Sequence, residues 1–365
     1  MIVKLEDVCE SGSSNLRQSD VEGLTGEYPI YGAAGHIGNV GFYHQEKPYV
    51  AVVKDGAGIG RTVLLPPKSS VIGTMQYLLP KENVLPEYLY YVVRNMHLGK
   101  YYSGATIPHI YFRDYKSEEF NLVSLEKQRE VVSLLRNVES IIDSRQKELQ
   151  YLEDLVKARF VEMFGDPEAN PKKWAKMSLS KLIVTANNGM ARRGNDEDGS
   201  IVMRLVELQD GFIDYSNPNR IRLSDAEKKR YLLEENDFLF ARVNGNPDNV
   251  GRCAVFYDIG EPVYHNDHII RVRFDNHLLN GAFASALLNS DYGKRQLKNQ
   301  IKTSAGQYTV SQDGIGAVVA IIPPVELQEQ FAAFVSQIDK LKFVVQQAIE
   351  KAQLLFESLM QKYFG

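Results

Sequence analysis

The stretch LEKQREVVSLLRNVESIIDSRQKELQYLEDLVKARFVEMFG (125–165) returns as VELQEQFAAFVSQIDKLKFVVQQAIEKAQLLFESLMQKYFG (325–365), and this repeat decides the fold. The two copies align without a gap, so that Gln128 matches Gln328 and both copies end in Phe-Gly. Self-similarity at a fixed distance along the chain is the sequence signature of a duplicated architecture. We therefore treat the chain as two halves, each ending in one copy.

Apolar residues recur in both copies at steps of three and four. They comprise Val131, Leu135, Val138, Ile142, Leu149, Leu152, Val156 and Met163 in the first copy, and Phe331, Val335, Ile338, Val345, Ala352, Leu355 and Leu359 in the second. This spacing predicts a long helix with one apolar stripe. Neither copy contains Pro, or Gly before its last residue. A helix of about 38 residues is about 57 Å long, more than is needed to cover a single domain, so we expect the two helices to pair as a coiled coil.

The segments ahead of the two helices also resemble each other. VAVVKDGAGIGRTVLL (50–65) parallels FLFARVNGNPDNVGRCAVF (238–256): a strand-like run, a basic residue, a turn ending in Gly-Arg, then a second strand-like run. GTMQYLLP (73–80) is aligned with HNDHIIRV (265–272), and residues 104–110 with residues 304–310. Each segment ends in a strand-like run that leads into its long helix.

The connector GDPEANPKKW, with two prolines and a Gly after Phe164, predicts a helix end and a linker. The expected fold class is α+β: two mixed α/β domains, each followed by a long helix, with the helices pairing as an antiparallel coiled coil of pseudo-two-fold symmetry. The expected boundaries are residues 1–124 for the first mixed domain, 125–164 for the first helix, 165–174 for the linker, 175–324 for the second mixed domain and 325–365 for the second helix.

Composition and charge exclude several classes of protein. The chain has 365 residues, of which 44% are hydrophobic and 24% charged, as in ordinary globular proteins. It shows no signal-peptide pattern, no apolar run of membrane length and only two cysteines, so we expect a cytoplasmic protein without a membrane partner. The 42 basic and 46 acidic residues leave a net charge of −4, and neither half is basic overall. Any DNA contact must therefore use confined basic surfaces.

No motif predicts catalysis, a metal site or a cofactor in this chain. The turn GAGIG (56–60) lacks the third glycine and the following helix of a dinucleotide fingerprint, and the phosphate-loop motif is absent. We interpret it as a β-turn. No cysteines or histidines have the spacing of metal ligands, and no nucleophile elbow is present.

What remains is a set of polar and aromatic residues in the predicted loops. Arg, Lys, Asn, Gln and His side chains read base edges, while Tyr contacts phosphate or stacks. The basic residues before and after the Gly-rich turn are the best candidates, because they recur in both halves. The DNA-binding candidates are Arg17, Lys54, Arg61, Gln76, Tyr102 and His109 in the first half and Arg192, Arg193, Arg242, Asn244, Arg252, Asn266, His268, Lys294, Arg295, Gln307 and Tyr308 in the second.

In this order the segments resemble the specificity subunits of type I restriction-modification enzymes. The resemblance covers the whole chain and is carried in the second half by SIVMRLVELQDGFID (200–214), ENDFLFARVNGNPDNVGR (235–252), SAGQYTVS (304–311) and IIPPVELQEQ (321–330). The connector MFGDPEANPKKW is also typical. In the first half the match is looser, since LVSLEKQREV (122–131) lacks the prolines of the second copy.

The resemblance implies a non-catalytic subunit that recognises double-stranded DNA. Each domain would read one half of a bipartite, asymmetric target, and the helices would set the distance between the halves. It also implies two methyltransferase subunits as partners, which bring S-adenosylmethionine for adenine methylation, and motor-nuclease subunits that can join with ATP and Mg²⁺. The host would be bacterial or archaeal.

Three alternatives stay open at this level. The chain could serve a methylation-only complex or another phage-defence assembly. It could be a coiled-coil scaffold whose domains bind protein, which predicts no salt-sensitive affinity for duplex DNA. It could also be a nucleotide-dependent enzyme built around GAGIG, against which the incomplete fingerprint argues.

Overall fold

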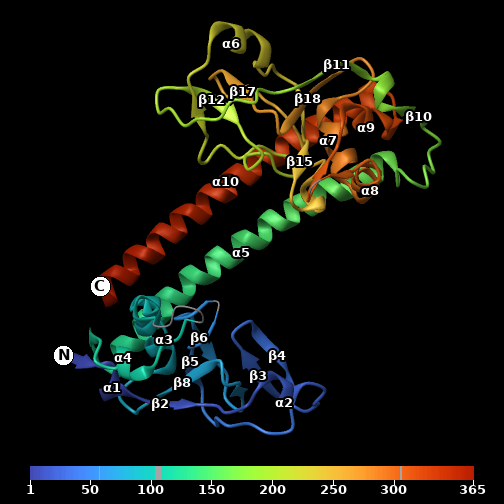
Figure 1. Ribbon diagram of the computed structural model, residues 1–365. Helices are drawn as coiled ribbons and strands as arrows, with labels where there is room; N and C mark the ends of the chain where they lie inside the picture. Colours follow the sequence, from blue (N-terminus) through green and yellow to red (C-terminus); the bar gives the residue numbers. More distant parts are fainter. Residues whose placement is uncertain (57, 103–107, 305) are drawn as a thin grey trace. The chain divides into compact units, whose positions relative to one another are not determined.

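The chain forms two compact units that are described separately (Figure 1). The computed structural model describes residues 1–56, 58–102, 108–304 and 306–365. Unit 1 comprises residues 1–147 and 345–365, and unit 2 comprises residues 148–344. The two long helices thus belong to both units: each contributes one end to unit 1 and the other end to unit 2.

Unit 1 contains three sheets. A four-stranded antiparallel sheet has the order β2 (Cys9–Ser13), β8 (Met75–Pro80), β5 (Tyr49–Val53), β6 (Thr62–Leu65). A second sheet has the order β4 (Gly35–Val40), β3 (Tyr28–Gly32), β7 (Ser70–Val71), and a third pairs β1 (Ile2–Lys4) with β9 (Glu119–Asn121). The helical elements are α1 (Leu5–Val8), α2 (Gln18–Val21), α3 (Pro86–Asn95), η1 (Leu98–Tyr101), α4 (Phe112–Tyr115) and the start of α5 (Leu125–Phe164).

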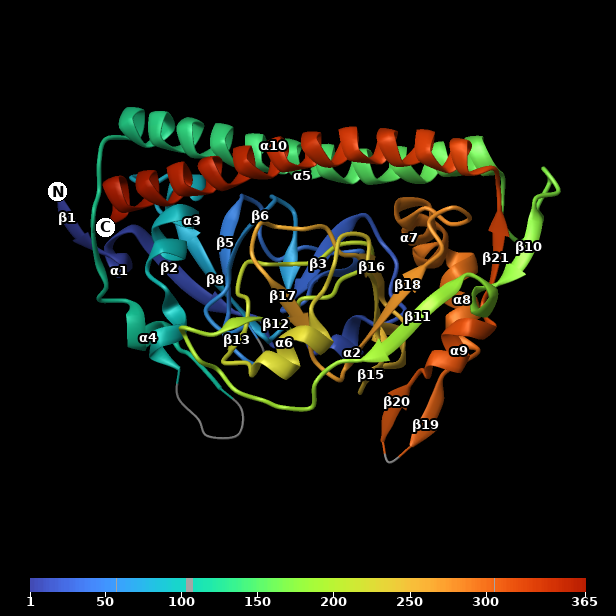
Figure 2. The same cartoon turned by 90° about the horizontal axis from the view of Figure 1, so that it is seen from above.

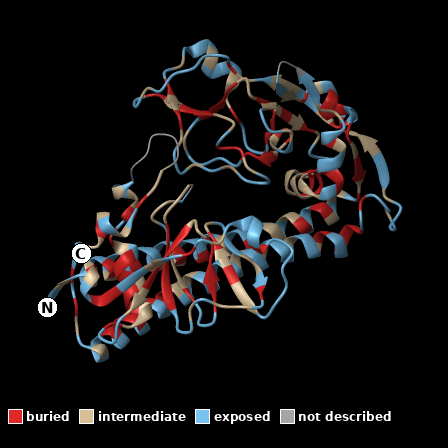
Figure 3. Cartoon of the chain, turned by 60° about the horizontal axis from the view of Figure 1, so that its bottom comes forward, coloured by how far each residue is buried: buried red, intermediate tan, exposed pale blue. Residues whose placement is uncertain are grey.

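Strand β5 forms the centre of unit 1. All five residues of its sequence YVAVV are buried, as expected for a continuous apolar run at the centre of a sheet. Helix α3 begins with Pro86 in its first turn, where the missing N–H costs nothing. Its face with Leu89 and Val92 packs into the same core as β5 and the first turns of α5. Figure 3 shows buried residues, in red, along strands and helices of both units.

Unit 2 repeats these three sheets and adds a fourth. The four-stranded sheet has the order β11 (Ile183–Asn188), β18 (Ile269–Phe274), β14 (Phe238–Ala241), β16 (Cys253–Val255). The others are β13 (Arg220–Ile221), β12 (Ser200–Met203), β17 (Val263–His265), then β10 (Ala175–Ser178) with β21 (Val319–Ile322), and the added β15 (Val243–Asn244), β20 (Gln307–Thr309), β19 (Lys302–Ser304). The helical elements are η2 (Leu179–Lys181), α6 (Asp225–Tyr231), η3 (Pro247–Asn249), α7 (Gly281–Asn289), α8 (Asp291–Lys298), α9 (Gln312–Ala317) and the start of α10 (Val325–Phe364).

The two units share strand order and strand direction. β3 pairs antiparallel with β4 and parallel with β7, and β12 pairs in the same way with β13 and β17. In each unit the first strand pairs with the strand that leads into the long helix. The structure thus combines helices and strands in two topologically equivalent units, as the internal repeat in the sequence indicates.

Both long helices are continuous over the predicted residues, and each helix entry is fixed by a buried glutamine. Gln128 accepts a hydrogen bond from the N–H of Leu85 (2.8 Å) and donates to the carbonyl groups of Asn83 and Val123. Gln328 makes the matching bonds to Asn280, Leu278 and Pro323. Both glutamines are fully buried. Each therefore ties the first turn of a long helix to the loop before α3 or α7.

The apolar stripe is correct for most positions and wrong for one. Val131, Leu135 and Val138 are buried in α5, and Phe331, Ile338 and Val345 in α10. Leu355 is 50% exposed, while its neighbour Phe356 is buried. The predicted position is one residue too early. Steps of three and four average 3.5 residues per turn, whereas the helix has 3.6, so the buried face moves slowly away from the predicted positions along the helix.

The linker caps the end of α5. The Trp174 indole N–H donates to the carbonyl of Phe164 at 2.9 Å, and the Lys172 ammonium donates to the carbonyl of Met163. Gly165 has φ +78°, and a Cβ there would lie 2.7 Å from the Pro171 ring, so only glycine fits. Among the described residues, no helix combines the length and apolar character that a membrane crossing requires.

Candidate nucleic-acid interface

The basic residue before the Gly-rich turn occupies the same backbone position in both units. The N–H of Lys54 donates to the carbonyl of Thr74 at 3.0 Å, and its own carbonyl accepts from Ile110 at 3.0 Å. The N–H of Arg242 donates to the carbonyl of His268 at 2.8 Å, and its carbonyl accepts from Val310 at 2.9 Å. Lys54 and Arg242 are therefore equivalent, and each is half-buried beside the turn between two strands.

The Gly-Arg pair after the turn is equivalent as well. The N–H of Val53 donates to the carbonyl of Arg61, and the carbonyl of Val53 accepts from Gly60. Ala241 makes the same two bonds with Arg252 and Gly251. Gly60 and Gly251 have φ values of +81° and +84°. This left-handed conformation is open to glycine at little cost, which explains why both turns end in Gly-Arg. Ala57, within the first turn, lies outside the described residues.

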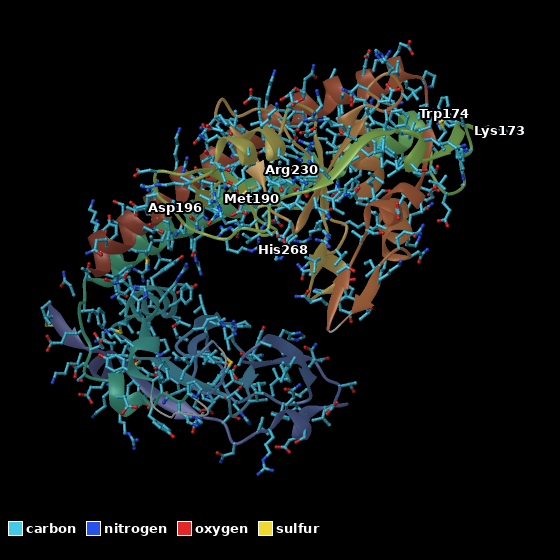
Figure 4. The ribbon with its side chains drawn as sticks, turned by 45° about the horizontal axis from the view of Figure 1, so that its top comes forward. Lys173, Trp174, Met190, Asp196, Arg230 and His268 are labelled. Carbon is cyan, nitrogen blue, oxygen red and sulfur yellow. The ribbon has the colours of Figure 1, made fainter. Side chains whose placement is uncertain are left out.

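In unit 2, three predicted residues meet at the turn between β17 and β18. The Arg193 guanidinium donates to Oδ1 of Asp267 at 2.6 Å and lies 3.1 Å from Nε2 of His268. Arg242 donates to the carbonyl of Asp267 at 3.1 Å. Figure 4 labels His268 and Met190, whose carbonyl accepts from the N–H of Asp267. Two arginines from other segments and one histidine of the turn thus lie together at Asp267.

A pocket of about 360 Å³ adjoins this turn and holds further candidates. Its lining includes Arg192, Arg193 and Asn266. Asn266 is buried, and its side-chain oxygen accepts from the N–H of His268. Arg192 pairs with Glu227 at 3.2 Å. Within this group, Arg193 is exposed and paired with Asp267, His268 is half-buried, and Asn266 shapes the turn.

His265, which directly precedes Asn266, belongs to the core. It is fully buried, and burial lowers its pKa to about 4, with a smaller contribution from the Arg271 charge. Nδ1 lies 3.2 Å from the carbonyl of Tyr231. The imidazole is therefore neutral and structural.

Three more candidates lie on the sheet β15–β20–β19 of unit 2, which has no counterpart among the described residues of unit 1. Asn244 pairs with Tyr308 across β15 and β20, and Gln307 is exposed at the start of β20. Figure 2 shows the β19–β20 hairpin, in orange, extending away from the rest of unit 2. A two-stranded ribbon with polar side chains is an element that fits the DNA major groove.

At the corresponding place in unit 1, the described residues form a contact between a histidine and an aspartate. Nδ1 of His109 lies 2.6 Å from Oδ1 of Asp55, and its ring stacks on Tyr111. The bridge between Asp55 and His109 takes the place of the β15–β20 pair. Arg17 and Tyr102 are exposed on loops away from these bonds. Residues 104–107 and 305, part of the predicted correspondence between residues 104–110 and 304–310, lie outside the described residues.

Four predicted contacts are already engaged inside the protein. Gln76 lies buried within β8 and accepts a hydrogen bond from the Tyr115 hydroxyl at 2.9 Å, so it is a core residue. Lys294 pairs with Asp210 at 2.7 Å, Arg252 contacts the same carboxylate at 3.6 Å, and Arg295 pairs with Glu168. The prediction considered basic residues without their acidic partners, which come from distant segments.

The predicted alignment of residues 73–80 with residues 265–272 is shifted by two. The N–H of Ile72 donates to the carbonyl of Tyr31, and the N–H of Asn266 donates to the carbonyl of Met203 in the same way. The turn Ile72-Gly73-Thr74 therefore matches the turn Asn266-Asp267-His268. Sequence reasoning also missed Asp55 and Asp267, although each directly follows or precedes a predicted residue. The available signal for these two aspartates was that each stands next to a basic residue in a turn.

Other chemistry finds little support in the described ranges. No three His, Cys, Asp or Glu side chains there gather as a metal site requires. Cys9 and Cys253 are both buried, and burial raises the pKa of the Cys9 thiol to about 12 and that of Cys253 still further. These thiols are protonated at neutral pH and unsuited to nucleophilic attack.

The chain is a duplicated α+β protein whose two units share the backbone frame of one turn. The family model for the type I restriction modification DNA specificity domain matches residues 1–154 and 171–353. The chain therefore belongs to the family of type I restriction-modification DNA specificity domains.

Curated relatives agree with this family. The chain is 31% identical over 196 residues to the type I restriction enzyme StySPI specificity subunit of Salmonella potsdam, covering 52% of this chain and 42% of that protein. It is 22% identical over 285 residues to the EcoKI specificity subunit of Escherichia coli K12, covering 72% of this chain and 60% of that protein. The matches thus span about half of these relatives' length.

The fold has close counterparts among solved structures. The S subunit of a type I restriction-modification system from M. genitalium superposes with a TM-score of 0.63 at 13% identity, covering 100% of this chain and 96% of that one. A chain from a study of complex assembly and conformational transition of the type I system gives a TM-score of 0.55 at 15% identity, covering 100% and 97%. Both likenesses concern the fold alone.

Proposed function

We propose that this chain is the sequence-specific DNA recognition subunit of a type I restriction-modification complex. Each unit reads one half of a bipartite, asymmetric double-stranded target. The observation that carries the proposal is the equivalent turn, which has the same backbone bonds in both units but Ile72-Gly73-Thr74 in one and Asn266-Asp267-His268 in the other. A shared frame with different side chains supports the reading of two different half-sites.

The long helices set the distance between the half-sites in this proposal. In unit 1, Leu135 near the start of α5 shares a core with Phe356 near the end of α10. In unit 2, Phe164 at the end of α5 contacts Phe331 near the start of α10, with ring centroids 5.5 Å apart. Both contacts support antiparallel pairing and pseudo-two-fold symmetry. A rod of about 57 Å is long enough to bridge major-groove sites one or more DNA turns of about 34 Å apart.

Catalysis belongs to the partners in this proposal. Two methyltransferase subunits bring S-adenosylmethionine and methylate adenine, which must leave the duplex stack for the reaction. Motor-nuclease subunits that use ATP and Mg²⁺ complete the complex where it restricts DNA. This chain contributes no cofactor, and the complex works in the cytoplasm of a bacterium or archaeon.

The test is a genome-wide map of methylated adenines. A host expresses the chain with its methyltransferase partner, or the partner alone. A bipartite, asymmetric motif that is present only with the chain supports the proposal and names both half-sites. A stable complex that adds no motif contradicts it and favours a protein-binding scaffold. Insertion of four residues into α5 is expected to change the spacer and leave the half-sites as they are.

A further inference from the structure

A cavity of unit 1 gathers basic side chains that the recognition turn does not use. It has a volume of about 530 Å³, and its lining comes from residues 59–62, Arg94 and residues 97–100. The cations on this lining are Arg61, Arg94 and Lys100, and it includes no acidic residue of the described chain. Arg94 and Lys100 each pair with a glutamate outside this lining, which leaves Arg61 as its cation without an ion pair to a described residue. A concave surface with such a cation favours an anion.

Unit 2 contains the equivalents of two of these cations. Arg61 and Arg252 each follow a glycine of positive φ and accept the same backbone bond. Lys100 and Lys294 each directly follow a glycine. Lys100 lies five residues after the last residue of α3, and Lys294 lies five residues after the last residue of α7; both of these last residues are asparagines. The two units thus build one arginine–lysine pair twice.

In unit 2 this pair holds an oxyanion of the protein itself. Lys294 Nζ lies 2.7 Å from Oδ2 of Asp210, and Arg252 Nε lies 3.6 Å from Oδ1. Gln209 accepts a further hydrogen bond from Arg252 at 3.2 Å. The geometry in unit 2 therefore shows which ligand the pair is shaped for: a group that offers two negatively charged oxygens.

Among its described residues, unit 1 offers Arg61 no counterpart of Asp210. Asp210 lies on the long connection between β12 and β13, residues 204–219, whereas β3 and β4 are joined by Ala33 and Ala34 alone. Lys100 pairs with Glu118 at 2.5 Å and Arg94 with Glu139 at 2.8 Å. Arg61 makes no ion pair with any residue that the structure describes. Arg61 is exposed, so an anion from outside the chain can reach its guanidinium.

We propose that the cavity at Arg61 and Lys100 binds a phosphate group. The position next to the recognition turn makes the DNA backbone the source, since Val53, which bonds to the Arg61 carbonyl, directly precedes Lys54. In this form the inference rests on the proposed function. A phosphate contact positions the duplex without reading its sequence. Unit 1 would thus hold its half-site through this phosphate contact, whereas in unit 2 the carboxylate of Asp210 occupies the equivalent place.

The experiment compares Arg61→Gln with the matched variant Arg252→Gln in the full chain with its methyltransferase partner. Affinity is measured against salt concentration for a duplex with the mapped target and for an unrelated duplex. Arg61→Gln is expected to lower the slope of log affinity against log salt by about 0.9 on both duplexes, which corresponds to one phosphate contact. Arg252→Gln is expected to leave the slope unchanged.

A second arm separates the two sources of phosphate. The free chain is titrated with inorganic phosphate at constant ionic strength while the arginine Nε–H signals are followed by NMR. A response that Arg61→Gln removes, together with an unchanged DNA slope, assigns the cavity to free phosphate. The inference is overturned if neither arm gives a response. It is also overturned if Arg61→Gln weakens only the binding of the methyltransferase, because the ligand would then be an acidic residue of that partner. If the unaltered chain binds no duplex, the proposed function fails, and the titration alone decides the cavity.

Discussion

The two halves of this chain share a backbone and differ in what they attach to it. The strands β3, β4 and β7 repeat as β12, β13 and β17 with the same directions. The connection between the first two strands grows from Ala33-Ala34 to residues 204–219, and a fourth sheet is added in unit 2. The difference shows that this frame tolerates large changes in loops, because loops lie on the surface and carry no shared packing. Recognition can thus diverge while the frame stays.

The largest expected effect tests the shared part of the frame. Gln128→Ala and Gln328→Ala each remove three hydrogen bonds of a buried side chain, one from a backbone N–H and two to carbonyl groups, so each should lower the free energy of unfolding by roughly 2–4 kcal/mol. Urea denaturation measures both. The exposed Gln146 and Gln346, on the same helices, supply the controls. A loss in only one half would show that the two helix entries are not equivalent.

The next effect distinguishes the two Gly-Arg turns. Gly60→Ala and Gly251→Ala both place a side chain at positive φ, at a cost of about 1–2 kcal/mol. At Gly60 the new Cβ would also lie 2.4 Å from the backbone nitrogen of Gly99, which adds roughly 1–3 kcal/mol of overpacking. At Gly251 it meets only the Leu297 side chain, at 3.3 Å.

Chemical denaturation of both variants gives this difference directly. Gly56→Ala is the matched control, since Gly56 has φ +83° and a Cβ there would meet no atom within 4 Å. It should cost the backbone strain alone. Equal losses at Gly60 and Gly251 would contradict the tight approach of Gly60 to Gly99.

A third prediction concerns DNA affinity at the basic position. Arg242→Ala is expected to weaken binding to the mapped target by about 1–3 kcal/mol, as the loss of one bidentate base contact does. Lys54→Ala should cost less, because an ammonium is a point charge and cannot form the bidentate pair. Titrations with target and unrelated duplexes give the answer. An equal loss on all sequences would make Arg242 a phosphate contact.

The smallest effect is a pH dependence confined to unit 2. The pKa of buried His265 is lowered to about 4, below that of an unfolded histidine near 6.5, so the unfolded chain binds more protons between these values. Stability from the neutral imidazole is complete above about pH 6.5 and falls as the pH drops. Between about pH 7 and pH 5.5 the expected loss is about 1 kcal/mol.

His265→Val tests this contribution with the residue of the other half. Val71 holds the equivalent place in unit 1, one residue before the shared turn. The variant should flatten the pH dependence of the unfolding free energy, whatever its absolute stability. The same slope in the variant and the parent would assign the dependence to other groups.

Much of the frame could be predicted from the sequence. The helices at 125–164 and 325–364, the linker and the strand pairs around the Gly-rich turns follow from local signals: apolar spacing, glycine and proline. The equivalence of Lys54 with Arg242 and of Arg61 with Arg252 could also be predicted. In both halves a basic residue precedes the Gly-rich turn and a Gly-Arg pair ends it. The site was predicted less well, since Gln76, Lys294 and Arg295 have partners that lie far away in the chain.

The sequence by itself determined that this protein is a duplication with two long helices, because helix periodicity and repeat spacing depend only on near neighbours. Only the tertiary structure decided which polar side chains are available. Asp210 reaches Arg252 and Lys294 from a loop some 40 to 80 residues away in the chain, and Gln76 is removed from the surface by the sheet around it. Such pairings depend on where the chain returns in space, because electrostatic and packing energies follow distance between atoms and not position in the sequence.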